Sequence, residues 1–162
     1  MSHENDSEDV NYRNFLKPVF DAVKERIATP ASGLDFGCGD GPALYEMLNA
    51  GGYEMSLYDL YFRPDRSPLH KTYDFVTCTE VVEHFRAPRE SFEELKSLVR
   101  PKGLLAIMTF IYPDDCDFEN WHYRRDPTHV SFYSKKSFEW LAERVLGAKA
   151  EFISSRIVCL RF

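Results

Sequence analysis

The chain has 162 residues, of which 44% are hydrophobic and 15% aromatic, and its formal net charge at pH 7 is −6. This length suits one domain with its own core, and the composition excludes a disordered chain. No apolar run approaches the roughly 18 residues of a membrane span, and the acidic balance disfavours nucleic acid as a partner.

The first residues are polar and acidic and lack the apolar stretch of a secretory signal. We therefore predict a disordered acidic tail over residues 1–10 and a single domain over residues 11–162. The cysteines have no Cys-x-x-Cys spacing, which favours free thiols in a reducing, cytoplasmic setting over a zinc site or disulfides. There are four of them: Cys38, Cys78, Cys116 and Cys159.

The first half of the chain alternates between helical and strand patterns. Residues 15–27 have apolar side chains at helical spacing. Residues 33–36 are a short apolar run that enters a glycine-rich turn, as a buried strand would. A helix over residues 42–50 then precedes two further strands, at residues 53–58 and 73–78.

The second half continues this alternation. Residues 88–99 predict an amphipathic helix, and the apolar residues 104–111 suit a strand in the middle of a parallel sheet. Residues 136–145 predict a last helix. A tight turn separates strands at residues 150–154 and 157–162, so these two should pair antiparallel.

Such alternation predicts an α/β domain whose mostly parallel sheet has helices on both faces and ends in an antiparallel hairpin. Residues 112–134 are too long for a simple connection and are rich in aromatic side chains. They could form an acceptor pocket for an aromatic or anionic small molecule, with Arg124 and Arg125 nearby. They could equally be a surface loop held by its own aromatic rings.

The strongest chemical signal is Gly37-x-Gly39-x-Gly41, between a predicted strand and a predicted helix. Glycines allow a sharp turn and a close approach to a ligand, and the helix N-terminus adds free N–H groups. The dinucleotide fingerprint G-x-G-x-x-G would need glycine at position 42, which is Pro42. Asp59 closes the next strand, where an acid can accept hydrogen bonds from ribose hydroxyls.

Three segments in order resemble the class I S-adenosylmethionine-dependent methyltransferases. They are residues 34–41 (LDFGCGDG), residues 73–84 (YDFVTCTEVVEH) and residues 121–134, which run from Trp-His to Asp-Pro-Thr-His-Val-Ser-Phe-Tyr-Ser. The branch they resemble most includes the ubiquinone-biosynthesis O-methyltransferases. The resemblance covers residues 30–160 or so and implies a Rossmann-like three-layer sandwich.

The resemblance implies S-adenosyl-L-methionine as the cofactor. Asp35 and the three glycines of the loop, Gly37, Gly39 and Gly41, would then contact its methionine end. The resemblance implies three further cofactor residues. Asp59 would hold the ribose, Leu60 would pack against the adenine, and Thr79 would lie near the cofactor after the strand that is the fourth in the family.

One departure from the family concerns the edge of the sheet. The family has a further strand between the Asp59 strand and the strand that begins at Tyr73, but residues 60–71 are too few for a β-α-β crossover. We therefore expect a sheet shortened by one edge strand. The adenine end would be open or covered by another chain, so a homo-oligomer remains an alternative.

Glu80, Glu83 and His84 follow the third predicted strand, at the sheet end where such folds bind ligands. In some relatives a matching Glu-x-x-Glu-His and a later histidine bind a metal. Here His129, or less readily His122, would complete a site for a divalent cation such as magnesium. Alternatively, His84 and Glu80 act as acid and base without metal, or the segment only shapes the pocket floor.

The function that we predict is methyl transfer from S-adenosylmethionine to a small-molecule acceptor, with O-methylation favoured. One alternative is a non-catalytic S-adenosylmethionine-binding sensor or partner subunit. Another is an NAD or nucleotide-sugar enzyme that uses the same loop, although its third glycine is absent.

Overall fold

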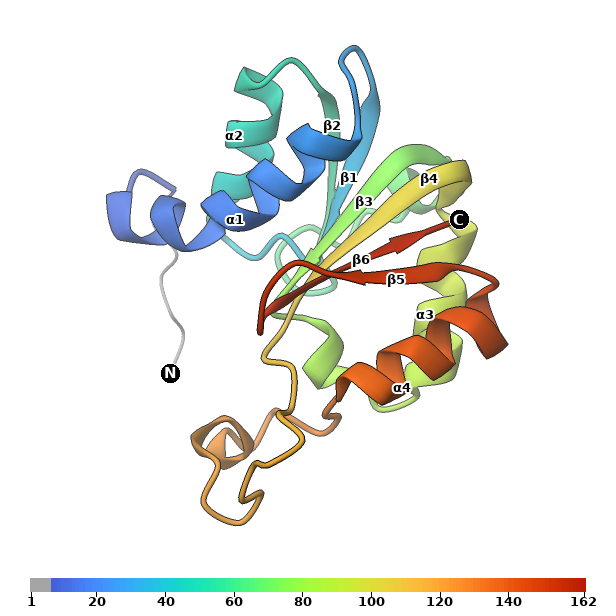
Figure 1. The fold of residues 1–162 in the computed structure, drawn as a ribbon. Coiled ribbons are helices and arrows are strands. Elements are labelled where there is room, and N and C mark those ends of the chain that lie inside the picture. The colour runs from blue at the N-terminus through green and yellow to red at the C-terminus, as the bar shows by residue number, and fades with distance from the viewer. Residues whose placement is uncertain (1–6) are drawn as a thin grey trace.

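The computed structural model describes residues 7–162. Six strands form one sheet with the order β2-β1-β3-β4-β6-β5 (Figure 1). The first four strands in this order are parallel, and β6 runs antiparallel to both of its neighbours. The predicted α/β fold, with its C-terminal antiparallel hairpin, is confirmed. The strands are β1 (Ser32–Phe36), β2 (Glu54–Tyr58), β3 (Tyr73–Thr79), β4 (Val99–Met108), β5 (Lys149–Phe152) and β6 (Ile157–Arg161).

Helices cover both faces of this sheet, which gives three layers (Figure 1). None of the helices within residues 7–162 is long and apolar enough to cross a membrane. The last α-helix continues as a π-helix, Leu141–Leu146, which ends at Gly147 in the left-handed conformation. The α-helices are α1 (Val10–Arg26), α2 (Ala43–Ala50), α3 (Pro88–Ser97) and α4 (Lys135–Trp140).

Two buried clusters lie on the two faces of the sheet, because successive side chains of a strand point to opposite sides. Phe75 and Leu104 pack with α1 and α2 in one cluster. Their chain neighbours Val76 and Leu105 pack with α3 and α4 in the other. The continuous apolar runs of β3 and β4 are therefore those of central strands that are buried on both faces.

The N-terminus differs from its prediction. Helix α1 begins at Val10 rather than at residue 15, because Asp9 caps it and accepts a hydrogen bond from the backbone N–H of Asn11 at 2.8 Å. Of the predicted tail, residues 1–6 lie outside the described residues. Ser7 is held in a turn, where its carbonyl accepts from Nε of Arg13 at 2.6 Å.

Strand β4 and the last helix also differ from their predicted bounds. Strand β4 begins at Val99, five residues before its predicted start, because Val99 pairs with Tyr73 across a register shift in β3. It ends at Met108, before the predicted residue 111. The predicted helix over residues 136–145 is α-helical only to Trp140 and then widens into the π-helix.

Strand β2 lies at one edge of the sheet, as the prediction of a shortened sheet requires, and β5 lies at the other. Residues 60–72 contain a short 3-10 helix, Ser67–His70, and no strand. Leu60, Tyr61 and Phe62, which follow β2, are 62%, 83% and 56% exposed. This edge therefore presents apolar side chains to solvent.

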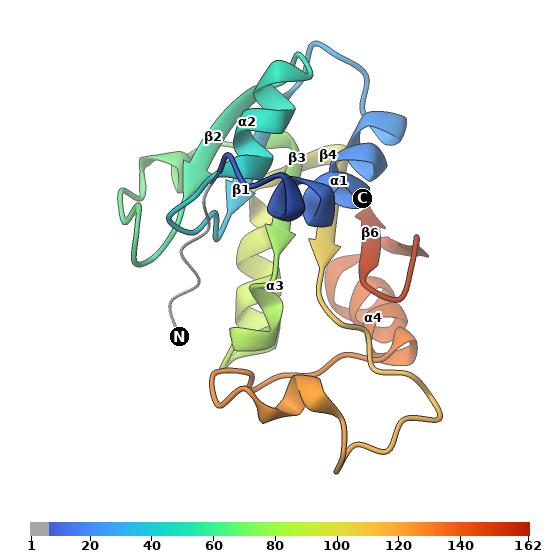
Figure 2. The same ribbon diagram turned by 90° about the vertical axis from the view of Figure 1, so that its left-hand side faces the viewer.

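The long segment over residues 112–134 projects from the carboxyl ends of the strands, away from the sheet (Figure 2). It contains a short 3-10 helix, His122–Arg125. Its two ends are joined, because the backbone N–H of Tyr112 donates to the carbonyl of Tyr133 at 2.7 Å. We call residues 112–134 the connecting segment.

Candidate functional site

The glycine loop lies at the carboxyl ends of β1 and β2, as its sequence predicts. Gly37 and Gly39 have φ angles of 76° and 68°, in the left-handed region that favours glycine. A Cβ atom at Gly37 would collide with the side chain of Val81. The N–H groups of Gly37 and Cys38 donate to the carbonyl of Tyr58 at 2.8 and 3.2 Å, which fixes the loop to the end of β2.

Asp59 fastens this loop from the other side. Its Oδ2 accepts a hydrogen bond from the backbone N–H of Gly39 at 2.9 Å, while Oδ1 accepts from Tyr61 and Phe62 at 2.8 and 3.0 Å. The residue is only 8% exposed. The carboxylate is thus oriented by backbone donors on both oxygens, and its assignment to a ribose stays a prediction.

Asp35 lies beneath the loop in the interior. It is 2% exposed, and its Oδ1 accepts a hydrogen bond from the hydroxyl of Thr77 at 2.8 Å. Burial raises the pKa of Asp35 to about 6, and the nearby Asp59 adds to this shift. The side chain is thus held in the interior by Thr77, and its assignment to the methionine end of the cofactor stays a prediction. Thr79, also predicted to lie near the cofactor, is half-buried at the last position of β3.

Tyr12, on α1, is a site residue that sequence reasoning missed. Burial, together with the nearby carboxylates of Asp35, Asp40 and Glu80, raises the pKa of its hydroxyl to about 12. The side chain packs against the buried cluster beneath α1 and α2 and lies within electrostatic range of the glycine loop and of Glu80. Its helical spacing with Phe15 would have revealed it, had the start of α1 been placed at residue 10.

Glu80 follows β3 with a φ angle of 53°, an uncommon conformation for a residue other than glycine. Burial and the neighbouring Glu83 raise the pKa of Glu80 to about 7. Its Oε2 lies 3.1 Å from the hydroxyl of Tyr123, which shares its one hydrogen with the nearer Glu83, whereas its buried Oε1 has no hydrogen-bond partner within residues 7–162. A carboxyl group with such a pKa can exchange a proton near neutral pH.

Glu83 is fully buried and connects β3 to the connecting segment. Its carboxylate accepts hydrogen bonds from the hydroxyls of Tyr123 at 2.6 Å and Thr109 at 3.1 Å. Its backbone carbonyl accepts from Val130 and Ser131 at 2.8 and 3.0 Å. Tyr123 was not singled out from the sequence because it is one of many aromatic residues in that segment.

His84 and His129 lie beside Glu83, with ring centroids 5.0 Å apart. Nδ1 of His84 is 3.0 Å from the carbonyl oxygen of Thr128, and Nδ1 of His129 is 2.7 Å from that of Tyr123. Nε2 of His129 also lies 3.7 Å from Oδ2 of Asp126. A carbonyl can only accept, so each Nδ1 carries a proton, and Nε2 is the nitrogen of each ring that would bind a metal.

Three of the four predicted metal ligands come together. Glu83, His84 and His129 offer ligand atoms that lie within 4.8 Å of one another. Glu80 is outside this group, because its carboxylate contacts Tyr123 and Arg156 instead. Two imidazoles and one carboxylate suit zinc or manganese better than magnesium, which prefers oxygen ligands. His122 is exposed and lies edge-to-face with Phe110, with ring centroids 5.5 Å apart.

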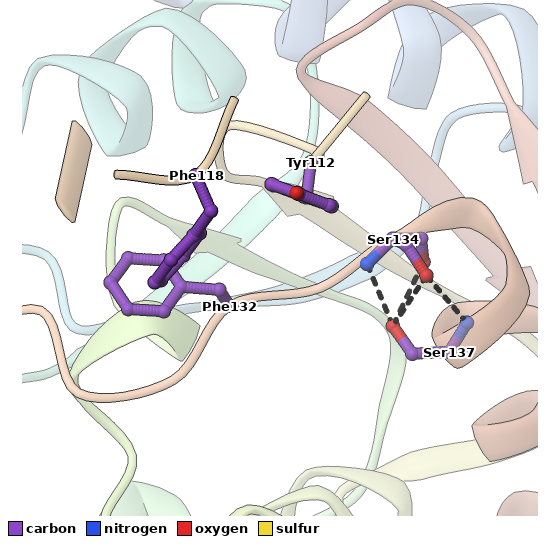
Figure 3. Close-up of a pocket in the computed structure, with 5 residues that line it drawn as sticks. All are labelled: Tyr112, Phe118, Phe132, Ser134 and Ser137. Carbon is purple, nitrogen blue, oxygen red and sulfur yellow. Dashed lines mark hydrogen bonds between the residues drawn. The ribbon is translucent and has the colours of Figure 1, made fainter. Parts of the chain in front are cut away.

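The connecting segment is held by its own aromatic rings. Phe118 packs against Tyr112 and Phe132 with ring centroids 5.8 and 5.4 Å apart. Figure 3 shows these three rings beside a pocket of about 190 Å³, whose other wall is formed by Ser134 and Ser137 at the start of α4. Arg124, predicted as a contact for an anionic acceptor, donates to the carbonyls of Phe118 and Glu119 at 3.4 and 2.8 Å.

The comparisons with known proteins agree with this architecture. A family described as methyltransferase domain matches residues 10–145. The fold resembles a methyltransferase of Burkholderia thailandensis that was solved with 1,6-didemethyltoxoflavin and S-adenosylhomocysteine, with a TM-score of 0.66 at 15% identity over 90% of this chain and 77% of that one. It also resembles the magnesium protoporphyrin IX methyltransferase of Synechocystis, with a TM-score of 0.64 at 13% identity over 94% and 84% of the two chains.

A relative with clearer sequence similarity is a tRNA U34 carboxymethyltransferase of Idiomarina loihiensis, which is 31% identical over 51% of this chain. The chain spans about one third of the length of that relative. The prediction that nucleic acid is not a partner therefore lacks support, because this relative is named for a tRNA substrate.

Proposed function

Because the chain belongs to the methyltransferase domain family, we propose that it transfers a methyl group from S-adenosylmethionine to an oxygen of a small-molecule acceptor. The observation that carries this proposal is the hydrogen bond between the glycine loop and Asp59 at the carboxyl ends of β1 and β2. That is the position at which open α/β sheets bind nucleotide-like ligands.

The residues divide between the two ends of the cofactor. The loop of Gly37, Gly39 and Gly41 would approach the methionine end closely, since no Cβ atom stands in the way. Asp59 would accept hydrogen bonds from the ribose hydroxyls, because its carboxylate oxygens retain acceptor capacity beside the backbone donors. The exposed Leu60 would lie against the adenine at the open edge.

Glu83, His84 and His129 would hold a divalent cation next to the acceptor. The bound cation would lower the pKa of the acceptor hydroxyl and orient it. The protein itself fixes the two imidazoles through the carbonyls of Thr128 and Tyr123 and orients Glu83 through Tyr123. Without a cation, Glu80 or His84 would take the hydroxyl proton.

Few side chains need to take part in the methyl transfer itself, because the sulfonium of S-adenosylmethionine is already a good leaving group. Bound S-adenosylmethionine would supply the methyl group to the acceptor oxygen as its own carbon–sulfur bond breaks, and it would leave as S-adenosylhomocysteine. The hydroxyl proton passes to the base. Catalysis then rests on holding the oxygen in line with that bond and on keeping water away.

A second candidate is transfer of a methyl or carboxymethyl group to RNA, which the name of the Idiomarina loihiensis relative favours. The net charge of −6 favours a small molecule, because RNA binding depends on neutralising phosphates. A non-catalytic S-adenosylmethionine-binding protein is a third candidate, for which the open β2 edge is the supporting observation.

Calorimetric titration with S-adenosylhomocysteine, with and without Mn²⁺ or Mg²⁺, tests the cofactor site. Micromolar binding is expected, and NAD should not bind. Transfer of a labelled methyl group to pooled small hydroxylated metabolites, with bulk tRNA in parallel, then separates the candidates. Label in tRNA alone would favour the RNA candidate, and binding without transfer to either would favour the non-catalytic one. Absence of binding would contradict the proposal.

A further inference from the structure

Arg156 occupies a fixed place at the mouth of the candidate site. It lies in the turn between β5 and β6, where its backbone N–H donates to the hydroxyl of Ser154 at 3.1 Å. Its carbonyl accepts from the backbone N–H of Thr109 at 2.9 Å, directly after β4. The turn is thus tied to the carboxyl end of the central strand.

The guanidinium of Arg156 lies against two aromatic rings, and its N–H groups make no hydrogen bond within residues 7–162. Its central carbon lies 4.5 Å from the ring centroid of Phe110 and 5.8 Å from that of Phe15. In the part of the chain that the structure describes, its one ion-pair partner, Oε1 of Glu80, is 3.8 Å away. The side chain is 38% exposed. A planar fork of N–H donors is therefore available to a ligand.

This position adjoins the groups that would act on the acceptor. Phe110, under the guanidinium, packs against Tyr123 with ring centroids 5.6 Å apart, and Tyr123 donates to Glu83. Carboxylates otherwise dominate this end of the sheet, so an anionic acceptor would need a cation there. Arg124 does not supply it, because its guanidinium is bonded within the connecting segment.

We propose that Arg156 is a specificity-determining residue that binds a carboxylate of the methyl acceptor, so that the acceptor is a hydroxy acid. This inference rests on the methyl transfer proposed above. Arginine suits this role because its fork matches a carboxylate with two parallel hydrogen bonds. Stacking on Phe110 holds the fork in one plane before the ligand arrives, which reduces the entropy lost on binding.

The test compares two probes that differ only in the carboxylate. The protein is first saturated with S-adenosylhomocysteine and then titrated with 3,4-dihydroxybenzoate or with catechol by calorimetry. We expect the wild type to bind the dihydroxybenzoate about tenfold or more tightly than catechol, as for a charge-assisted hydrogen bond in a half-buried site. Arg156→Gln should lose this preference, and Arg156→Lys should keep part of it.

The controls separate this proposal from the assignment of the cofactor site. Arg144→Gln removes the same charge from an exposed helical position and should keep the preference. The affinity of Arg156→Gln for S-adenosylhomocysteine should stay within about twofold of the wild type, as a residue that does not touch the cofactor requires. Its circular dichroism and Tm show whether it is folded.

Three results would overturn the proposal. They are the absence of a preference for the carboxylate probe in the wild type, a preference that persists in Arg156→Gln, and a folded Arg156→Gln that no longer binds S-adenosylhomocysteine. The last would assign Arg156 to the carboxylate of the cofactor's methionine end. Failure of the wild type to bind S-adenosylhomocysteine would instead contradict the proposed function itself.

Discussion

The backbone N–H of Gly39 donates a hydrogen bond to Oδ2 of Asp59 at 2.9 Å, across 20 positions of the chain. The glycine loop after β1 and the acid after β2 are therefore one structural unit. A change at either residue should alter both ends of the proposed cofactor site, because the same carboxylate orients the loop and offers acceptor sites to the ribose.

Gly39→Val should abolish binding of S-adenosylhomocysteine while the sheet stays folded. Gly39 has a φ angle of 68°, which a β-branched residue adopts only with strain, and its N–H would move away from Asp59. Calorimetry measures the binding, and circular dichroism checks the fold. The matched control is Gly147→Ala, at a φ angle of 64° with nothing within 4 Å of the added Cβ. It should cost about 1 kcal/mol of stability and keep the affinity. Binding by a folded Gly39→Val protein would refute the assignment of the loop.

Asp35→Asn should change how stability depends on pH. Because the pKa of Asp35 is raised from 3.8 to about 6, the folded state holds this proton more tightly than the unfolded chain does. The contribution of Asp35 to the free energy of unfolding therefore falls as the pH rises from about 4 to about 6, by up to about 3 kcal/mol, and levels off above. Urea unfolding across this range should show a smaller fall for the variant, whereas Glu143→Gln on an exposed helical position should follow the wild type. Parallel curves for Asp35→Asn and wild type would contradict the raised pKa.

His129→Gln should weaken binding of Mn²⁺ to the protein by about tenfold or more, since it removes one of three candidate ligands. Calorimetry of the protein saturated with S-adenosylhomocysteine measures the effect. His122→Gln is the matched control, because His122 lies in the same segment but is exposed and outside the group of ligands. An equal loss in both variants, or no binding of Mn²⁺ or Zn²⁺ to the wild type, would remove the metal from the proposed mechanism.

Tyr123→Phe should lower the free energy of unfolding by about 1–3 kcal/mol, because the buried carboxylate of Glu83 loses its shorter hydrogen bond while Thr109 remains. Chemical denaturation measures the change. Tyr133→Phe is the control, since the hydroxyl of Tyr133 donates to the neutral carbonyl of Val82 at 2.9 Å and should cost less. A larger loss in Tyr133→Phe would show that Tyr123 is not the main support of Glu83.

Local patterns were enough to predict most of the fold. The apolar runs of β1 to β4, the order of the helices and the final antiparallel hairpin were predicted from periodicity and turn residues. The glycine loop and Asp59 could be placed because each directly follows its strand, and parallel strands end at the same edge of a sheet. The predicted bounds of α1 and β4 were wrong, because a cap at Asp9 and a register shift in β3 decided them.

Patterns along the chain therefore determined the class of fold and the loop, since both depend on residues that are close in sequence. The shortened edge was predicted from the resemblance to the methyltransferases, because residues 60–71 are too few for the further strand of that family. Tertiary structure decided which distant side chains surround the end of β3. Tyr123 and Arg156 reach Glu80 from 43 and 76 positions away, through the connecting segment and the turn before β6. Tyr12 on α1, 68 positions away, lies within electrostatic range of it. Tertiary structure also grouped His129, rather than His122, with Glu83 and His84. These contacts between residues that are distant in sequence depend on the order of strands in the sheet and on the path of the connecting segment. Neither leaves a periodic signal in the sequence.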